Sequence, residues 1–512
     1  MDRREFVKSA AVVASGSALG MPAAVAGAQQ PTGNQEQIIV VRPQRTVRPF
    51  PHIWEKCVGS DRASVSLRAQ WQADLEVVRK EAGIEHVRFH GLLSDEMGVW
   101  PSGAREPNFL YVDMVFDAIV ERGVKPFVEL SFMPKHLASG TQTVFFYRAN
   151  VTPPQDMQQW GGLVSALASH CIQRYGIDEV SAWGFEVWNE PNLPFFWSGT
   201  QAQYFELYRQ SASALKSVDS RLRVGGPATA RASWVGDFLN FCAAQRVPID
   251  FVSTHIYPDD PQSVVFGPGV HYPFEEVIPQ ALRKLKGQIA ASQFLHLPLY
   301  ITEWTSQNPA FIVHTIKGSA GLADMMSYWT FDSVYEELGI PKTFMNSSFG
   351  LIGLRGIPRP SFHTFTLLHR LGDAEVSTTD GPVLATRRAD GSLSIMVWNL
   401  IPEPPGKRSA TGDPTVQTTA EYANEGNVKH IVLKFADVHH HFKGRITRVD
   451  ENSGNLRKAY EAIGSPAYPT TAQIEQLKRF SAPAPPEHVH TDGEGQISIS
   501  IPPNGVALLE LA

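Results

Sequence analysis

Residues 183–192 read WGFEVWNEPN, a pattern specific enough to predict the fold around it. An apolar run the length of one strand ends in Asn189, Glu190 and Pro191. Proline has no backbone N–H and cannot continue a strand ladder, so the chain must turn directly after Glu190. The pattern therefore predicts a buried strand with one carboxylate at its C-terminal end, where (β/α)8 barrels carry their functional side chains.

Residues 298–304, PLYITEW, repeat this pattern with Glu303. The two glutamates are 113 positions apart (303 − 190), which corresponds to about three strand–helix units of a barrel. The spacing predicts that they follow strands 4 and 7, which face each other across the barrel mouth. Trp188 and Trp304 stand near them in sequence, and we expect a glutamate at such a strand end to be desolvated.

Short apolar runs alternate with helix-length amphipathic segments between about residues 50 and 370. The segments 70–81 and 204–218 are two predicted helices. The predicted strands are 86–89, 126–132, 182–187, 224–226, 250–255, 299–302 and 326–330, with an eighth around 57–59. Eight such repeats predict an α/β fold, a (β/α)8 TIM barrel. A doubly wound sheet would carry a glycine-rich turn after its first strand, and the sequence has none there.

The pattern changes after residue 371 to short, alternating β-rich runs separated by Pro, Gly and Asn. These runs are 383–388, 392–399, 429–435, 444–449, 496–501 and 506–511. They predict a β-sandwich domain at 372–512 beside a barrel domain at 45–371, with the run 37–41 joining the sandwich. The segments 403–415 and 481–495 are rich in Pro, Gly, Ser and Asp and are predicted loops.

The N-terminus predicts an export signal. RREFVK at 3–8 precedes an apolar, small-residue run at 10–19, and AGA at 26–28 offers a cleavage site. This order is typical of a twin-arginine signal peptide, here residues 1–28, so we expect a periplasmic or secreted protein. No later run approaches about 18 uninterrupted apolar residues, so no membrane span is expected.

Composition narrows the possible partners. The chain has 512 residues and a net charge of −6, which argues against a nucleic-acid partner. Cys57, Cys171 and Cys242 show no C-x-x-C spacing, which favours buried thiols over a zinc site, although one disulfide stays open. The tract HHH at 439–441 lies beside a predicted strand, where side chains alternate and do not converge on one ion. We expect no metal or other cofactor; the oligomeric state stays open, a homo-oligomer included.

Two carboxylates across a barrel mouth are the groups that cleave a glycosidic bond. One protonates the departing oxygen, and the other attacks the anomeric carbon or activates water; Asn189 is placed to bind a sugar hydroxyl. A lone glutamate at a strand end is more often a salt-bridged residue, so the hypothesis depends on the pair. A non-catalytic carbohydrate-binding protein on this scaffold would have lost one of them. An inverting enzyme would hold them about 6.5–9.5 Å apart, and a retaining one about 5–5.5 Å apart.

On these residues the chain resembles glycoside hydrolase family 39, which includes bacterial β-xylosidases and, as relatives, α-L-iduronidases. The likeness runs from Trp54 to the C-terminus. The matching stretches are CVGS (57–60), HGLLSD (90–95), FMPK (132–135), NVTPP (150–154), FEVWNEPN (185–192), VGGP (224–227), DFVS (250–253), ITE (301–303) and YWTF (328–331).

The resemblance implies a retaining double displacement with Glu190 as general acid/base and Glu303 as nucleophile. It implies no cofactor. For the substrate, the resemblance implies exo-acting β-D-xylosidase activity, which releases xylose from xylo-oligosaccharides. It also implies sugar-binding roles for Asn189, His90, His255, Tyr257, Trp329 and one or both of Glu336 and Glu337.

Two mouth segments differ from the xylosidases of the family: WTSQ at 304–307 and the loop 256–276. They leave the reaction type unchanged but leave open an arabinopyranoside, a galactoside or a uronide as substrate. The acidic net charge disfavours the uronide. Two further residues have alternative roles: Glu186 either supports the site or forms a barrel-wall ion pair, and Trp197 either stacks on a leaving-group sugar or packs the loop.

Overall fold

The computed structural model describes residues 36–512, apart from 102, 338, 341–343, 346–348, 403–425 and 439–440. The predicted signal at 1–28, the predicted loop at 403–415, and His439 and His440 therefore lie outside the described residues. Among the residues that are described, none of the helices combines the length and apolar character needed to cross a membrane.

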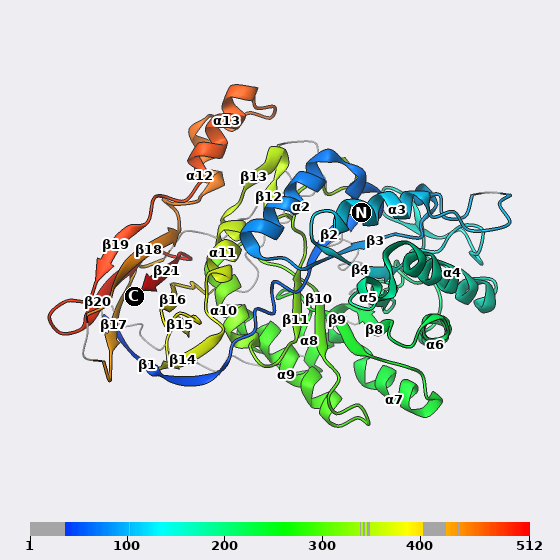
Figure 1. Ribbon diagram of the computed structural model, residues 1–512, viewed down its shortest axis with the longest axis horizontal. Coiled ribbons are helices and arrows are strands. Elements are labelled where there is room, and N and C mark those ends of the chain that lie inside the picture. The colour runs from blue at the N-terminus through cyan, green and yellow to red at the C-terminus, as the bar shows by residue number, and fades with distance from the viewer. Residues whose placement is uncertain are drawn as a thin grey trace, which may run out of the picture.

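Eight parallel strands close into a barrel in the order β10-β11-β2-β3-β4-β7-β8-β9 (Figure 1). This confirms the predicted TIM barrel, and all eight predicted runs overlap these strands. Counted from β2, β7 is the fourth barrel strand and β10 the seventh. The strands are β2 (Val58–Arg62), β3 (His86–His90), β4 (Lys125–Leu130), β7 (Gly184–Val187), β8 (Arg223–Thr229), β9 (Phe251–His255), β10 (Leu299–Trp304) and β11 (Met325–Tyr328).

Helices surround the barrel, each burying an apolar stripe against the strands (Figure 1). The predicted helices 70–81 and 204–218 are α2 and α6, and α6 begins with a capping box formed by Thr200 and Gln203. The main helices are α2 (Ala69–Ala82), α3 (Leu110–Val120), α4 (Met157–Tyr175), α6 (Gln201–Val218), α7 (Val235–Gln245), α9 (Val277–Ala290), α10 (Pro309–Ser319) and α11 (Pro360–His369). Cys57, Cys171 and Cys242 are buried free thiols.

A nine-stranded sheet lies beside the barrel, in the order β19-β18-β21-β16-β15-β14-β1-β17-β20 (Figure 1). Its ends meet, because Arg448 on β18 donates a hydrogen bond to the Ser500 carbonyl of β20 at 3.0 Å, and one apolar core fills the interior. This is the predicted sandwich. Its strands are β1 (Gln37–Pro49), β14 (Ala374–Thr378), β15 (Val383–Arg387), β16 (Leu393–Trp398), β17 (Lys429–Phe435), β18 (Lys443–Val449), β19 (Glu487–His490), β20 (Gln496–Ile501) and β21 (Val506–Leu511).

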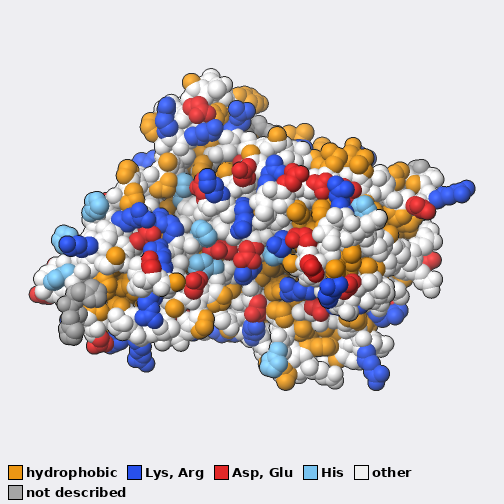
Figure 2. Space-filling model, in the orientation of Figure 1, with side chains coloured by type: hydrophobic (Ala, Val, Ile, Leu, Met, Phe, Trp, Pro, Cys, Tyr) orange, Lys and Arg blue, Asp and Glu red, His pale blue; other side chains and the backbone are white. Residues whose placement is uncertain are grey.

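One sandwich prediction was wrong. The predicted loop 481–495 contains β19, whose side chains are largely exposed and which pairs only with β18. Backbone pairing with β18 is enough to hold β19 in the sheet. Its sequence therefore need not show the apolar alternation by which a half-buried strand is recognised. Two helices, α12 (Leu456–Ala462) and α13 (Thr471–Phe480), project from the sheet and were not predicted (Figure 1). On the face drawn in Figure 2, acidic and basic side chains are interspersed over barrel and sheet.

Candidate active site

Glu190 stands in a sharp turn after β7. Trp188 and Glu190 both adopt left-handed backbone conformations, with φ of 71° and 45°. The Glu190 N–H donates to the Ala228 carbonyl at 2.8 Å, which fixes the turn against the next strand. The side chain is 1% exposed. Such a conformation is costly for a non-glycine residue and is found where the surrounding structure holds a functional side chain in place.

Glu303 lies on β10, across the barrel from Glu190, and is completely buried. Two side chains donate to its carboxylate. The Tyr257 hydroxyl binds Oε2 at 2.7 Å, and the Arg88 guanidinium binds Oε1 at 3.0 Å. These bonds hold the carboxylate in one orientation, and the guanidinium stabilises its negative charge.

His255, the last residue of β9, lies between the two glutamates. Its Nδ1 is 3.0 Å from Glu190 Oε1 and 3.5 Å from Glu303 Oε1, and the three groups offer atoms within 4.8 Å of one another. One oxygen of each glutamate thus lies within 4.8 Å of the other, below the about 6.5–9.5 Å that inverting enzymes need to admit a water between their carboxyl groups. Arg88 Nη2, which can only donate, is 3.4 Å from His255 Nε2, so that nitrogen accepts and Nδ1 carries the hydrogen.

Arg88 is the site residue that the sequence did not reveal. It lies fully buried on β3, and its guanidinium contacts Glu186 at 2.6 Å, Glu129 at 2.7 Å and Glu303 at 3.0 Å. It also donates to Asn189 Oδ1 at 3.0 Å. Burial lowers the pKa of Arg88, but the charges of the three glutamates raise it above its ordinary value, so the guanidinium stays charged. Glu186 thus forms the barrel-wall ion pair and supports Glu303 through the same arginine.

A signal for this network was present in the sequence. Arg88, Glu129 and Glu186 each stand inside an apolar strand, on three strands that are neighbours in the barrel. Charged residues in such positions must find partners in the interior, because an unpaired buried charge is very costly.

His90 ends β3 and is held between acidic groups. Its Nδ1 is 2.8 Å from Glu129 Oε2, and its Nε2 is 3.4 Å from Glu337 Oε1 and 3.8 Å from Glu303 Oε1. Burial lowers the pKa of His90, but the Glu129 charge and the hydrogen bonds that the imidazole donates to Glu129 and Glu337 raise it to about 10. His90 is therefore an imidazolium at neutral pH. Its ring centroid lies 4.6 Å from that of Trp329.

Glu336 and Glu337 point to different neighbours. Glu336 pairs with Arg68 and with Arg62, the latter at 3.1 Å; burial raises its pKa, but these arginines lower it to a net value below normal. Glu337 instead approaches His90 and accepts from the Tyr335 hydroxyl. The structure thus brings Glu337 to the other site residues and holds Glu336 in an ion pair beside them.

Two of the buried donors that have no hydrogen-bond partner among the described residues belong to side chains that contact Arg88 or His90. They are Asn189 Nδ2 and Trp329 Nε1. A buried N–H that lacks a partner is costly, and a hydroxyl of a bound ligand would satisfy each. Asn189 is held to the site by Arg88, and Trp329 lies against His90.

The predicted desolvation of the two carboxylates is confirmed, because Glu190 is 1% exposed and Glu303 is fully buried. The two neighbouring tryptophan rings pack against other groups. Trp188 packs edge-on against Trp160 and Trp197, and its N–H donates to the Phe196 carbonyl. The Trp304 ring packs edge-on against Tyr328, because neighbouring side chains on a strand point to opposite faces, and Glu303 points inward. Trp197 is 1% exposed and donates to the Thr200 carbonyl, so in this structure it packs the loop.

Two groups of described residues have ligand atoms close enough to hold a metal ion. One is Glu190, His255 and Glu303, in which the ligand atoms belong to the carboxylate pair and its bridging histidine. The other, His52, Glu55 and His369, lies apart from these residues and is considered below.

Known proteins resemble this chain in sequence and in fold. The model of the family "Glycosyl hydrolases family 39" matches residues 37–498. A beta-xylosidase of Geobacillus stearothermophilus is 38% identical over 511 residues, covering 92% of this chain and 95% of that protein. A beta-xylosidase of Caldicellulosiruptor saccharolyticus is 38% identical over 455 residues, covering 84% and 88%. The crystal structure of a monomeric beta-xylosidase from Caulobacter crescentus CB15 superposes with a TM-score of 0.81 at 31% identity, covering 93% of this chain and 99% of that one.

The family match spans the barrel and most of the sandwich, and it includes both strands that carry the paired glutamates. The separation of those carboxylates suits a reaction that retains the anomeric configuration. This chain belongs to glycosyl hydrolases family 39 and is a retaining glycoside hydrolase.

Proposed function

We propose that this protein is an exo-acting β-D-xylosidase that releases xylose from xylo-oligosaccharides. In this proposal Glu190 is the general acid/base and Glu303 the nucleophile. The observation that carries it is the buried pair of carboxylates joined through His255, at 3.0 Å and 3.5 Å. Support for the sugar comes from the two beta-xylosidases that are each 38% identical to this chain.

In the first step, a Glu303 oxygen attacks the anomeric carbon, and the bond from that carbon to the leaving-group oxygen breaks. Glu190 transfers its proton to the departing oxygen. The product is a glycosyl ester on Glu303 with inverted anomeric configuration. Glu303 starts as the anion because Arg88 contacts it at 3.0 Å, and two carboxylates this close in a buried site do not both carry charge.

In the second step, Glu190 is a carboxylate and removes a proton from water, whose oxygen attacks the anomeric carbon. The ester bond breaks, Glu303 returns as the carboxylate, and the second inversion restores the original configuration. The His255 Nδ1–H donates to Glu190 Oε1 at 3.0 Å, which leaves Oε2 as the oxygen that carries the transferred proton. Arg88 and Tyr257 hold Glu303 throughout.

The charges of the site favour a neutral sugar over a uronide. The cations nearest the pair, Arg88 and His90, are each already bound to carboxylates. A uronate would bring a further negative charge among Glu129, Glu303 and Glu337, where Arg88 and His90 already pair with these carboxylates. Neutral hydroxyls instead suit the amide of Asn189 and the indole N–H of Trp329.

A screen on aryl glycosides tests the proposed substrate. The set is a β-xyloside, an α-arabinopyranoside, a β-galactoside, a β-glucoside and an α-iduronide, with kcat/KM measured for each. We expect the β-xyloside to give the highest value. A higher value on another sugar would contradict the xylosidase proposal and assign specificity to the segments 256–276 and 304–307. Inactivity on the whole set would contradict exo action and indicate a need for a longer substrate.

Glu190→Ala tests the acid/base assignment. The substitution removes the proton donor, so cleavage of substrates with poor leaving groups falls by about 10²–10⁴-fold. Aryl glycosides with a strongly acidic phenol need little protonation, and their first step is largely preserved. The measurement is kcat/KM across a series of phenols of increasing pKa, for Glu190→Ala and for wild type. An equal loss on every phenol would contradict this role for Glu190.

Export remains part of the proposal. It rests on RREFVK at 3–8, the apolar run at 10–19 and AGA at 26–28. We expect the full-length chain to be recovered outside the cytoplasm, and the Arg3→Lys/Arg4→Lys variant to stay inside it. Equal export of both forms in a fractionation experiment would contradict a twin-arginine route.

A further inference from the structure

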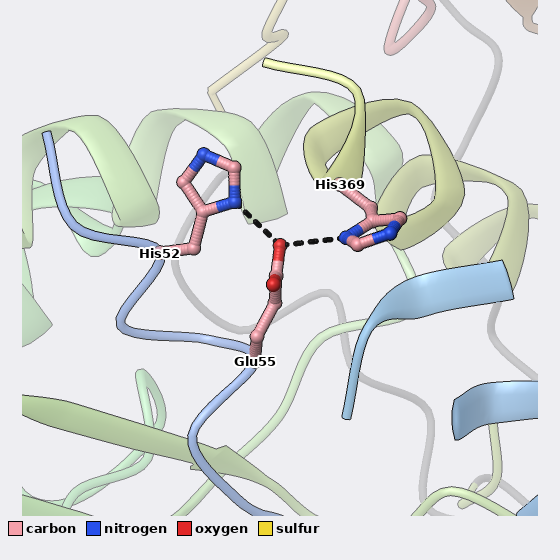
Figure 3. A group of neighbouring side chains, drawn as sticks. All are labelled: His52, Glu55 and His369. Carbon is pink, nitrogen blue, oxygen red and sulfur yellow. Dashed lines mark hydrogen bonds and ion pairs between the residues drawn. The ribbon is translucent and has the colours of Figure 1, made fainter. Parts of the chain in front are cut away.

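A group of three side chains lies at the end of the barrel opposite the paired glutamates. His52 and Glu55 stand in the turn before β2, so they lie at the N-terminal ends of the barrel strands, and His369 is the last residue of α11. Figure 3 shows both imidazoles turned toward the Glu55 carboxylate. These three residues are called the His52–Glu55–His369 cluster below. Glu55 and His369 are 314 positions apart in sequence, and the fold brings them together.

The contacts converge on one oxygen. His52 Nδ1 is 2.6 Å and His369 Nδ1 3.0 Å from Glu55 Oε1, and all three atoms lie within 4.8 Å of one another. His52 is held in place by Trp54, whose ring stacks on it at 4.5 Å between centroids. Two imidazole nitrogens and a carboxylate oxygen are the ligand set of a common class of zinc site.

Gly83 lies directly against the cluster, and its lack of a side chain leaves space for the two histidines and Glu55. Gly83 ends α2 in a left-handed conformation, with φ of 74°. A Cβ at this position would lie 2.5 Å from His369 Nδ1 and 2.7 Å from Glu55 Oε2. A side chain at residue 83 would therefore displace both the imidazole and the carboxylate, so the glycine keeps the space around the cluster open.

We propose that the His52–Glu55–His369 cluster binds a divalent transition-metal ion of the Zn²⁺ type, coordinated by the Nδ1 atoms of both histidines and a Glu55 oxygen. Nitrogen ligands select such ions over Ca²⁺ and Mg²⁺, which take oxygen ligands. The ion links the segment before the first barrel strand to the end of the last barrel helix. It stabilises the closed barrel and takes no part in hydrolysis.

The fit requires a small movement. Metal–ligand bonds of about 2.0–2.2 Å place tetrahedral ligand atoms roughly 3.4 Å apart, which is wider than the 2.6 Å and 3.0 Å contacts here. The His369 side chain is 39% exposed at a helix end, so it can move outward, and water can supply the fourth ligand. His52 Nε2 is buried without a hydrogen-bond partner among the described residues, so no acceptor orients this imidazole from behind. We therefore expect a dissociation constant for the ion on the order of micromolar.

The charges suit a cation and predict a pH dependence. The Glu55 carboxylate oxygen lies 2.6 Å from His52 Nδ1 and 3.0 Å from His369 Nδ1, so the cluster combines one anionic oxygen with two imidazoles. A metal ion competes with protons for the imidazole nitrogens, so binding strengthens as pH rises through the histidine range.

Thermal unfolding of the untagged, chelator-treated full chain tests the proposal. Zn²⁺ at about a hundredfold excess over its dissociation constant should raise Tm by about 2–4 °C. Equilibrium dialysis should find one ion per chain that is lost in Glu55→Gln and His369→Gln. The shift should shrink at about pH 5.5, where protons compete for the imidazoles.

Two controls locate the ion. His314→Gln breaks a different histidine–glutamate pair, His314 Nε2 to Glu276 at 3.1 Å, and should keep the full Zn²⁺ shift. Glu303→Gln should also keep it, whereas its loss would place the ion on the Glu190–His255–Glu303 group. The proposal is overturned if wild type shows neither bound ion nor shift, or if Glu55→Gln and His369→Gln keep both. None of these outcomes depends on which sugar the enzyme cleaves.

Discussion

One guanidinium, that of Arg88, contacts three carboxylates at the centre of the barrel. Its bonds to Glu129, Glu186 and Glu303 are 2.7, 2.6 and 3.0 Å long, and every partner is completely buried. Removing one partner of a buried charge network leaves the others uncompensated, which costs more than the network contributes when it is complete. The residue thus couples the stability of the barrel to the charge state of Glu303.

Arg88→Met tests this coupling. We expect the free energy of unfolding to fall by about 3–5 kcal/mol, because three buried carboxylates lose their shared cation. Turnover of folded Arg88→Met should fall as well, since Glu303 is no longer held as the anion. Arg88→Lys keeps one charge and should be intermediate in both respects. Denaturant unfolding and kcat of the three proteins provide the check, and wild-type stability in Arg88→Met would contradict the account.

Among single residues, the sequence revealed the groups that end strands, and inside the strands it singled out Glu186 but neither Arg88 nor Glu129. Glu190 and Glu303 stand beside turn signals and aromatic runs, and this gives each a recognisable local pattern. Arg88 stands one residue before a phenylalanine in a five-residue strand, and its partners come from other strands. The sequence could not show which of Glu336 and Glu337 approaches the site, because this depends on Arg62 and Arg68 from distant segments.

At the scale of elements, α2 carries a buried acid on its core face. Asp74 is 3% exposed; Gln70 donates to its Oδ1 at 2.7 Å, while its Oδ2 has no hydrogen-bond partner among the described residues. Burial raises the pKa of Asp74 to about 7. Between about pH 4 and 7 the unfolded chain ionises this group and the folded chain does not, so its contribution lowers stability as pH rises through that window.

Asp74→Asn should therefore stabilise the protein in a pH-dependent way. At about pH 8 we expect a gain on the order of 2 kcal/mol over wild type, because the amide carries no charge to bury. At about pH 3 both folded and unfolded wild-type chains are largely protonated at this position, and the gain should disappear. Thermal unfolding at both pH values measures it. A variant less stable than wild type at both would show that Asp74 is bound as a carboxylate.

Element prediction succeeded where burial repeats with a fixed period. The barrel strands are buried along their length and separated by amphipathic helices, so all eight were found. The sandwich strands that were missed lack that signal. β14 buries one residue of five fully, and β19 none, because both are held by backbone pairing with neighbours that only the folded sheet supplies.

At the scale of the whole molecule, Glu510 ties the barrel to the sandwich. This residue of β21 binds Arg370, which directly follows α11, and also Arg388 at 2.8 Å and Arg445 at 2.7 Å. Burial raises the pKa of Glu510, but the three arginines lower it to about 2. Its contribution to stability is therefore present above the ordinary glutamate pKa of about 4.3 and is lost as pH falls toward 2.

Glu510→Gln should lower stability at neutral pH by about 1–2 kcal/mol, since the amide cannot pair with three cations. The difference from wild type should narrow below about pH 4, where wild type begins to lose the same interactions. Tm measured from about pH 7 down to about pH 3 gives the comparison. A difference that stays constant over this range would assign the loss to packing and not to charge.

In a retaining reaction Glu303 forms a covalent bond to the sugar, and this intermediate can be trapped. A 2-deoxy-2-fluoro-β-xyloside with a good leaving group slows the second step more than the first, so the glycosyl-enzyme accumulates. Mass spectrometry of the intact chain and of its peptides then locates the added sugar. The account predicts one sugar per chain, on the peptide that contains Glu303, and none in Glu303→Ala. A label on another carboxylate, or an unlabelled enzyme that releases the opposite anomer from the natural substrate, would contradict it.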